Sequence, residues 1–337
     1  MKFKRKVRNR FFAEIQELSS VEYEIGAEAS CTCGAYVKQV FPQIKKDIII
    51  VYAKGTRDLA SIQMRLPQVA RNLLYYNSKI KIIALSLSSP ELFLKKDKII
   101  LLTKFASELI SLSDLKTLAN NQNFVIVDPI DNLLKIDKFK NVNLILASSL
   151  NQEQFLNDLG IGSVKLLYHS SDLRLDGIKS QQDNFSIGYF GNLKRIPIEF
   201  GSITDLSIVK TPLSYEPRRN IPRYADAMKE FPVHLAAGSI VPNLVFKPFT
   251  KGIVAEHVGA ISLISRIEKE AVTFLGSNYP YIADDNSKKS IIEMIDFMRE
   301  TFKSATWDLA KESHKKLRPL TCRYHVTMLW QSLLCNI

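Results

Sequence analysis

The chain has 337 residues, 46% hydrophobic and 24% charged, and its mean hydropathy is -0.03. This balance is typical of a soluble globular protein and excludes a disordered chain, while the length suits two domains that each bury a core. No apolar run reaches the ~20 residues needed to span a bilayer, and the basic start lacks the apolar segment of a signal peptide, so we expect a cytoplasmic protein.

The formal net charge of +12 is concentrated at the start of the chain, where MKFKRKVRNR carries no acid and is followed by two phenylalanines. Basic residues beside aromatic ones bind anionic lipid at ~1 kcal/mol per cation, which favours a peripheral contact with the inner membrane through residues 2–12. A solvated tail explains the same pattern equally well. We expect no nucleic-acid partner, because no helix-turn-helix, zinc-finger or basic–aromatic strand pattern accompanies the charge.

Short runs of Ile, Val and Leu alternate with helical stretches through the first half of the chain. The expected strands are 47–53, 80–87, 98–103, 123–128, 143–148 and 164–169. The expected helices include 59–77 and 151–160, the second with a glycine at its end. Such alternation indicates a parallel sheet built from βαβ units, so we expect an N-terminal Rossmann-like domain over residues 1–175.

A polar stretch at 170–184 interrupts this rhythm and indicates a linker. Further strands are expected at 185–191, 207–210, 232–238 and 260–265, followed by helices at 288–317 and 324–337. The sequence thus predicts an α/β fold with a second Rossmann-like domain over 185–320. Residues 321–337 should form a terminal helix that packs back toward the first domain through one apolar face.

Ligands of open parallel sheets bind beyond the carboxyl ends of the strands. In the second half, the residues that follow a strand or begin a helix are Gly191, Asn192, Lys194, Arg195, Lys247, Thr250, Lys251, Glu268 and Glu270. Pro248 favours the first turn of a helix, whose N–H groups attract an anion, and the nearby lysines would add charge. The alternative is that these lysines are ordinary solvent-exposed charges at the start of a helix.

Three segments of the second half, IGYFGN, KPFTKGIVAEHVGAISLIS and EKEAVTFLGSNYPYI, resemble the glycosyltransferases of the GT-B fold. The second segment is similar to the donor motif of bacterial surface-polysaccharide transferases. The resemblance implies two Rossmann-like domains facing each other across a cleft, with the acceptor in the first and a nucleotide-sugar donor in the second. It implies transfer of the sugar to a glycan or lipid-linked acceptor during surface polysaccharide synthesis, with the nucleotide sugar as a substrate and with no cofactor and no metal.

The sequence also departs from that family. Retaining members often carry two glutamates eight positions apart, and the corresponding residues here are Phe246 and Val254. Ribose recognition is then expected from Glu268 or Glu270, and the choice between a retaining and an inverting reaction stays open.

A catalytic base is expected in the first domain, at the carboxyl end of a strand. Asp128 and Asp131 in VIVDPIDN fit this position, and Asp58 is a rival, although each also suits a helix cap or turn. Arg57, Arg65 and His169 are candidates for anchoring the substrate. The alternative function is a non-catalytic two-domain α/β protein that binds a small ligand. The absence of GxGxxG and P-loop motifs argues against a nicotinamide enzyme or P-loop ATPase.

Overall fold

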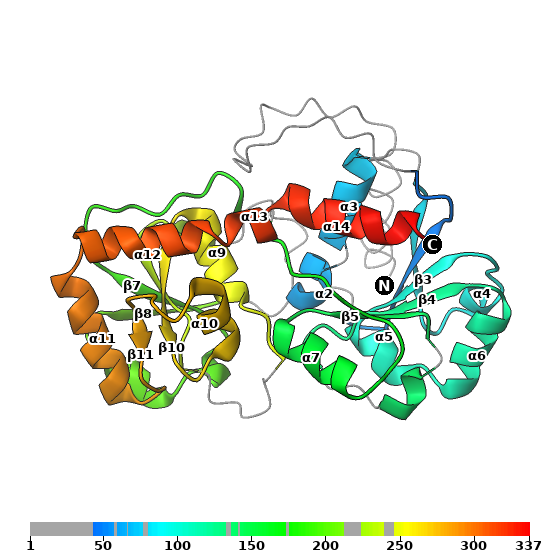
Figure 1. The fold of residues 1–337 in the computed structure, drawn as a ribbon, viewed down its shortest axis with the longest axis horizontal. Coiled ribbons are helices and arrows are strands. Elements are labelled where there is room, and N and C mark those ends of the chain that lie inside the picture. Colours follow the sequence, from blue (N-terminus) through cyan, green and yellow to red (C-terminus); the bar gives the residue numbers. More distant parts are fainter. Residues whose placement is uncertain are drawn as a thin grey trace, which may run out of the picture. The chain divides into compact units, whose positions relative to one another are not determined.

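The computed structural model describes residues 43–56, 59–65, 67–76, 80–132, 136–140, 142–172, 175–211, 224–238 and 246–337 (Figure 1). The segment 2–12, Arg57 and Asp58 lie outside these ranges. The chain divides into two compact units. Unit 1 contains the described residues up to His169 together with Arg323–Ile337, and unit 2 contains the described residues from Ser170 to Cys322.

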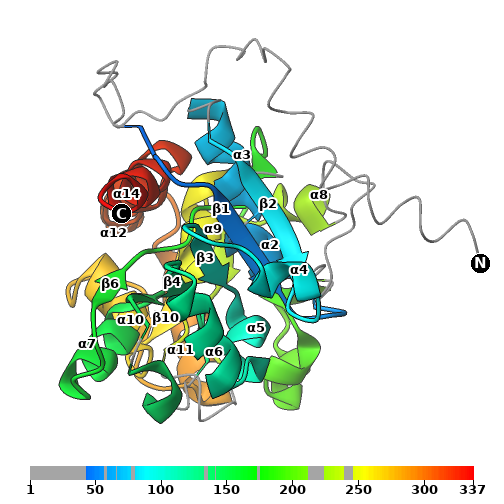
Figure 2. The ribbon, with the colours of Figure 1, turned by 90° about the vertical axis from the view of Figure 1, so that its right-hand side faces the viewer.

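Unit 1 is built on a parallel sheet with the strand order β2-β1-β3-β4-β5-β6. Its strands are β1 (Ile48–Tyr52), β2 (Ile82–Ser86), β3 (Ile99–Leu102), β4 (Phe124–Val127), β5 (Leu144–Ala147) and β6 (Val164–Leu166). The register pairs Ile48 of β1 with Ile82 of β2 and with Ile99 of β3. Figure 2 shows β1 and β2 running side by side.

The helices of unit 1 are α2 (Ala60–Arg65), α3 (Pro67–Tyr76), α4 (Pro90–Phe93), α5 (Lys104–Leu109), α6 (Leu112–Asn120), α7 (Leu150–Asp158) and α14 (Arg323–Cys335). The expected single helix at 59–77 is therefore two helices. Leu66, between them, lies outside the described residues, and Pro67 suits the first position of α3 because proline has no N–H to donate. Ser149 caps α7 by accepting a hydrogen bond from the N–H of Gln152.

Both faces of this sheet are buried. In β1, Ile48 and Ile50 belong to one apolar cluster, whereas Ile49 and Val51 belong to another. Successive side chains of a strand point to opposite faces, so the clusters lie on the two sides of the sheet. Helices α3 and α14, which pack on each other, contribute to the first cluster, and α5, α6 and α7 contribute to the second. Burial on both faces explains why these strands are nearly continuous apolar runs.

Unit 2 has a second parallel sheet with the order β11-β10-β9-β7-β8. Its strands are β7 (Ile187–Gly191), β8 (Leu206–Lys210), β9 (Val233–Leu235), β10 (Ile261–Ser265) and β11 (Ile282–Ala283). Its helices are α8 (Tyr224–Met228), α9 (Thr250–Val258), α10 (Lys269–Leu275), α11 (Lys288–Glu300), α12 (Ala305–Lys315) and α13 (Arg318–Thr321).

The expected helix at 288–317 is also two helices, α11 and α12. Helix α11 ends at Glu300, and Lys303 between the two helices adopts a positive φ of 61°, which a continuous right-handed helix does not allow. Ser304 then caps α12, because its side chain accepts a hydrogen bond from the N–H of Thr306. No helix in the described part of the chain combines the length and apolar character needed to cross a membrane.

Candidate functional site

The carboxyl ends of three neighbouring strands define one edge of the sheet in unit 2. β7, β9 and β10 are parallel, and the register pairs Val233 of β9 with both Ile187 of β7 and Ile261 of β10. Gly191, Leu235 and Ser265 therefore end their strands at the same edge. Ligands of open parallel sheets bind at such an edge, so its side chains are the first candidates for a site.

Near this edge Lys251 interacts electrostatically with three charged side chains and lies over a tyrosine ring, and we call the group the cationic cluster: Arg195, Lys247, Lys251, Glu268 and Tyr189. Lys251 lies in the first turn of α9, and its Nζ is 4.0 Å from the centroid of the Tyr189 ring. Tyr189 is in the middle of β7 and is 2% exposed. This is close range for a cation–π contact, so the ring of a core residue supports the ammonium group from one side.

The cationic cluster has three basic side chains and one carboxyl group. Burial, together with the positive charges of Lys247 and Arg195, lowers the pKa of Lys251 to about 7 against the opposing effect of Glu268. Burial raises the pKa of Glu268 to about 7 against the opposing effect of Lys251 and Lys247. Both shifts have the same cause, because burial disfavours the charged form of each group. An anion entering the cluster would favour the protonated form of Lys251.

The start of α9 has no side-chain cap. Phe249 occupies the cap position without a capping hydrogen bond. The N–H of Thr250 donates to the Pro248 carbonyl at 2.7 Å, and the Thr250 hydroxyl donates to the same oxygen at 3.4 Å. A helix start carries a partial positive charge, so α9 adds to the attraction of Lys251 for an anion.

The turn after β7 supplies the other side of the cluster. Asn192 accepts a hydrogen bond from the N–H of Lys194 at 3.0 Å through its side-chain oxygen, which fixes the turn that carries Arg195. Lys194 is exposed, whereas Arg195 is partly buried and lies close enough to Lys251 and Tyr189 to shift their pKa values.

The two glutamates of the expected site differ in position. Glu268 precedes α10, and its N–H donates to the Ser265 carbonyl at 3.0 Å. Its carboxylate acts on Lys251 and on Tyr189. Glu270 lies in the first turn of α10 and is only 6% exposed. Glu268 is therefore the glutamate that belongs to the cationic cluster.

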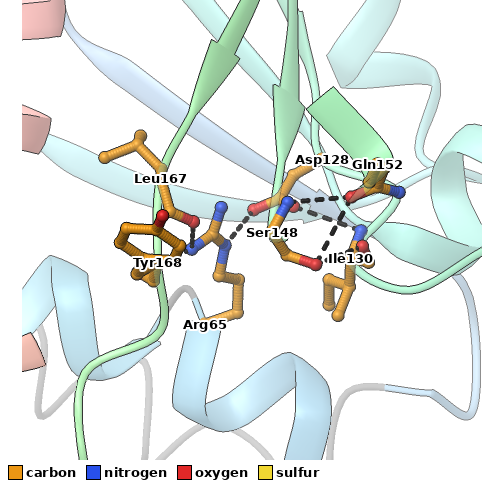
Figure 3. Close-up of polar contacts among 7 residues, drawn as sticks. All are labelled: Arg65, Asp128, Ile130, Ser148, Gln152, Leu167 and Tyr168. Carbon is orange, nitrogen blue, oxygen red and sulfur yellow. Dashed lines mark hydrogen bonds and ion pairs between the residues drawn. The ribbon is translucent and has the colours of Figure 1, made fainter. Parts of the chain in front are cut away.

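In unit 1, Arg65 and Asp128 form a buried ion pair (Figure 3). The Nε of Arg65 is 2.8 Å from Oδ2 of Asp128, and the two side chains are 1% and 0% exposed. Nη1 of Arg65 donates to the carbonyl oxygens of Leu167 at 2.5 Å and Tyr168 at 2.9 Å. The guanidinium also lies 5.7 Å from the ring centroid of Trp330 in α14. In this geometry both charged groups hold elements of unit 1 together.

His169 follows these carbonyls and is 5% exposed. Burial, assisted by the charge of Arg65, lowers its pKa to about 3, so the imidazole is neutral near pH 7. Neither ring nitrogen has a hydrogen-bond partner among the residues that the structure describes. A neutral imidazole offers one donor and one acceptor, which suits a hydroxyl group of a ligand.

Asp131 forms an ion pair with Lys104, and each side chain is 14% exposed. Burial raises the pKa of Asp131, but the charge and hydrogen bond of Lys104 outweigh this effect, so the pKa is lowered. The same carboxylate acts electrostatically on His169. The carboxyl edge of the first sheet thus places an ionised carboxylate close to a neutral imidazole.

The structure brings many of the residues expected from sequence into two groups. Arg195, Lys247, Lys251 and Glu268 meet in unit 2, and Arg65, Asp128, Asp131 and His169 lie together in unit 1. Sequence reasoning missed Tyr189 and Lys104. Lys104 directly follows the expected strand 98–103, so the rule on strand ends could have found it, whereas Tyr189 lies inside a strand and carried no such signal.

The described residues contain no group of three or more His, Cys, Asp or Glu side chains placed to hold a metal ion. Neither a family model nor a curated protein sequence matches the chain.

Solved structures do match its fold. A glycosyltransferase from Rickettsia africae superposes with a TM-score of 0.60 at 10% identity, covering 87% of this chain and 99% of that one. Sucrose-phosphate synthase from Thermosynechococcus elongatus superposes with a TM-score of 0.59 at 10% identity, covering 86% of this chain and 98% of that one. Together with the two parallel sheets, these matches confirm the expected α/β fold of the GT-B type.

Proposed function

We propose that the protein is a glycosyltransferase that moves a sugar from a nucleotide-sugar donor to a glycan or lipid-linked acceptor. The observation that carries the proposal is the cationic cluster at the carboxyl edge of unit 2. It combines three cationic side chains with one carboxylate, and α9 begins within it without a side-chain cap. The fold shared with a glycosyltransferase structure is consistent with this function.

The chemistry of sugar transfer accounts for these charges. When the glycosidic bond to the donor breaks, negative charge develops on the departing diphosphate, and fixed cations stabilise it. Lys247, Lys251 and Arg195 would take the role that a divalent metal has in other enzymes, with the N–H groups of α9 in support. Glu268 would accept hydrogen bonds from the ribose hydroxyls.

The acceptor is proposed to bind unit 1. His169 has ring nitrogens without a partner among the described residues, and a sugar hydroxyl would reach these buried atoms after neighbouring side chains move; Asp131 is the ionised carboxylate near this imidazole. We propose Asp131 as the base for an inverting reaction. Both carboxylates are paired with a cation, but Asp128 is a weaker candidate because its side chain is fully buried, whereas that of Asp131 is 14% exposed.

Two finer proposals rest on the sequence. The motif KPFTKG favours a role in bacterial surface polysaccharide synthesis, and the basic residues in 2–12 favour peripheral contact with an anionic membrane. Sedimentation with vesicles of anionic and of neutral lipid, using the full chain and a chain lacking residues 2–12, tests the contact. Equal sedimentation of the two chains with anionic vesicles would refute it.

A thermal-shift panel of UDP, GDP, ADP, CDP and dTDP tests the donor site, because a ligand that binds only the folded state raises the melting temperature. We expect at least one of them to stabilise the protein at millimolar concentration. Lys247→Ala with Lys251→Ala should abolish the shift. Lys311→Ala is the matched control, because this lysine of α12 pairs with Asp308 at 2.7 Å on an exposed surface.

Release of nucleoside diphosphate from a nucleotide sugar tests turnover. Binding without any release, in the presence of candidate acceptors, would favour the non-catalytic ligand-binding alternative. No stabilisation by any of the five nucleotides would count against a donor site altogether.

A further inference from the structure

Tyr189 belongs both to the apolar core of unit 2 and to the cationic cluster. It lies in the middle of β7, pairs with Ile208 of β8, and belongs to the apolar core of unit 2. Core tyrosines at such positions ordinarily contact other apolar side chains. Here one face of the ring carries the Lys251 ammonium at 4.0 Å, so a core residue reaches directly into the cationic cluster.

The hydroxyl of the same side chain reaches the turn after β7. It donates to the carbonyl oxygen of Asn192 at 3.1 Å. A Cβ atom added at Gly191 would lie 2.7 Å from this hydroxyl, which is closer than real Cβ contacts come. The lack of a side chain at Gly191 therefore leaves room for the Tyr189 hydroxyl to reach the turn that carries Arg195.

One side chain thus contacts Lys251 directly and bonds the turn that carries Arg195. Lys251 lies on α9 and Arg195 lies in the turn after β7, and Tyr189 contacts both of these segments. Both cations repel each other electrostatically. Without a common support, an unliganded protein would separate two like charges, since lysine has a long flexible side chain with several rotamers.

We propose that Tyr189 is the positioning residue of the cationic cluster, and that it holds the Lys251 ammonium and the Arg195 turn at a fixed spacing for one diphosphate before the ligand arrives. This inference rests on the proposed donor site and deepens it. Fixed charges bind an anion better than mobile ones, because the ordering has been completed during folding.

Two substitutions separate the contacts of Tyr189. Tyr189→Phe keeps the ring under Lys251 and removes the bond to Asn192, whereas Tyr189→Leu removes both. Pyrophosphate and the five nucleoside diphosphates are titrated calorimetrically. We expect Tyr189→Leu to bind roughly 2- to 30-fold more weakly than Tyr189→Phe, the range that corresponds to one cation–π contact. In a cycle with Lys251→Met, the losses from Tyr189→Leu and Lys251→Met should not add.

A second readout needs no nucleotide. Acetylation of Lys251, followed by mass spectrometry of its peptide near pH 7, reports how well the ring shields the amine. The rate should rise in Tyr189→Leu and stay near the wild-type rate in Tyr189→Phe. Tyr281→Phe is the control, because Tyr281 is a buried tyrosine of the same unit whose hydroxyl pairs with Thr301 at 3.1 Å.

Should Tyr189→Leu not fold, Gly191→Ala replaces it. The added methyl group would lie 2.9 Å from Cζ of Tyr189, so it displaces the ring together with the hydroxyl, and the labelling rate should rise. Unchanged labelling in the folded variants, or additive losses of pyrophosphate affinity, would overturn the role of Tyr189. Altered labelling in a protein that binds no nucleotide would leave Tyr189 as the support of Lys251 and refute the donor site alone.

Discussion

Asp128→Asn tests whether the ion pair between Arg65 and Asp128 stabilises unit 1. Asparagine keeps the size of the side chain and removes its charge, which leaves the Arg65 guanidinium uncompensated at 1% exposure. Removal of one partner from a buried ion pair costs about 3–5 kcal/mol. For a unit of about 150–250 residues, each kcal/mol lowers the melting temperature by about 2–4 °C. The transition of unit 1 should therefore fall by about 6–20 °C.

Tryptophan fluorescence can follow each unit separately. The chain has two tryptophans, Trp330 in unit 1 and Trp307 in unit 2. In a Trp307→Phe background, Asp128→Asn should lower the transition that Trp330 reports. In a Trp330→Phe background, the transition that Trp307 reports should be lowered much less.

Asp97→Asn is the matched control, because Asp97 pairs with Lys46 at 3.1 Å while 66% exposed. Exposed pairs contribute about 0–1 kcal/mol, so this variant should melt close to the wild type. A shift for Asp128→Asn no larger than that of Asp97→Asn would refute the role given to the buried pair.

Two further predictions concern stability. Burial lowers the pKa values of His169, His234 and His314 to about 3. Between about pH 6.5 and 3 the unfolded chain therefore binds protons that the folded chain does not. The urea concentration at the midpoint of unfolding should fall as the pH drops below about 6.5. A midpoint that does not change from pH 7.5 to 5 would contradict this. Gly252→Ala places a methyl group 2.0 Å from the buried Phe249 ring. It should lower the free energy of unfolding in urea by about 1–3 kcal/mol and weaken pyrophosphate binding. Gly201→Ala should do neither, because its added methyl group meets nothing within 4 Å.

The architecture was accessible from sequence because its signal is local. Runs of Ile, Val and Leu are long enough to mark each strand of the first sheet, and the parallel α/β prediction is confirmed. Strand β11 escaped notice, since a two-residue strand has no periodicity. Pro67 at the start of α3 can be recognised in the sequence, whereas the break between α11 and α12 includes a positive φ at Lys303, which the sequence does not reveal.

The candidate site was accessible only in part, because its contacts join distant residues. Arg65 and Asp128 were each singled out, yet their pairing spans 63 positions in the sequence. Tyr189 looked like an ordinary strand residue, and its contact with Lys251 depends on a helix that begins some sixty residues later. The roles of these residues in binding or catalysis stay predictions.

A crystal structure of the protein with a nucleoside diphosphate tests the central claim most directly. We predict that the diphosphate oxygens lie within hydrogen-bond distance of Lys251 Nζ and of the Arg195 guanidinium, at the start of α9, with the ribose toward Glu268. A diphosphate bound away from the carboxyl edge of β7, β9 and β10 would contradict the account.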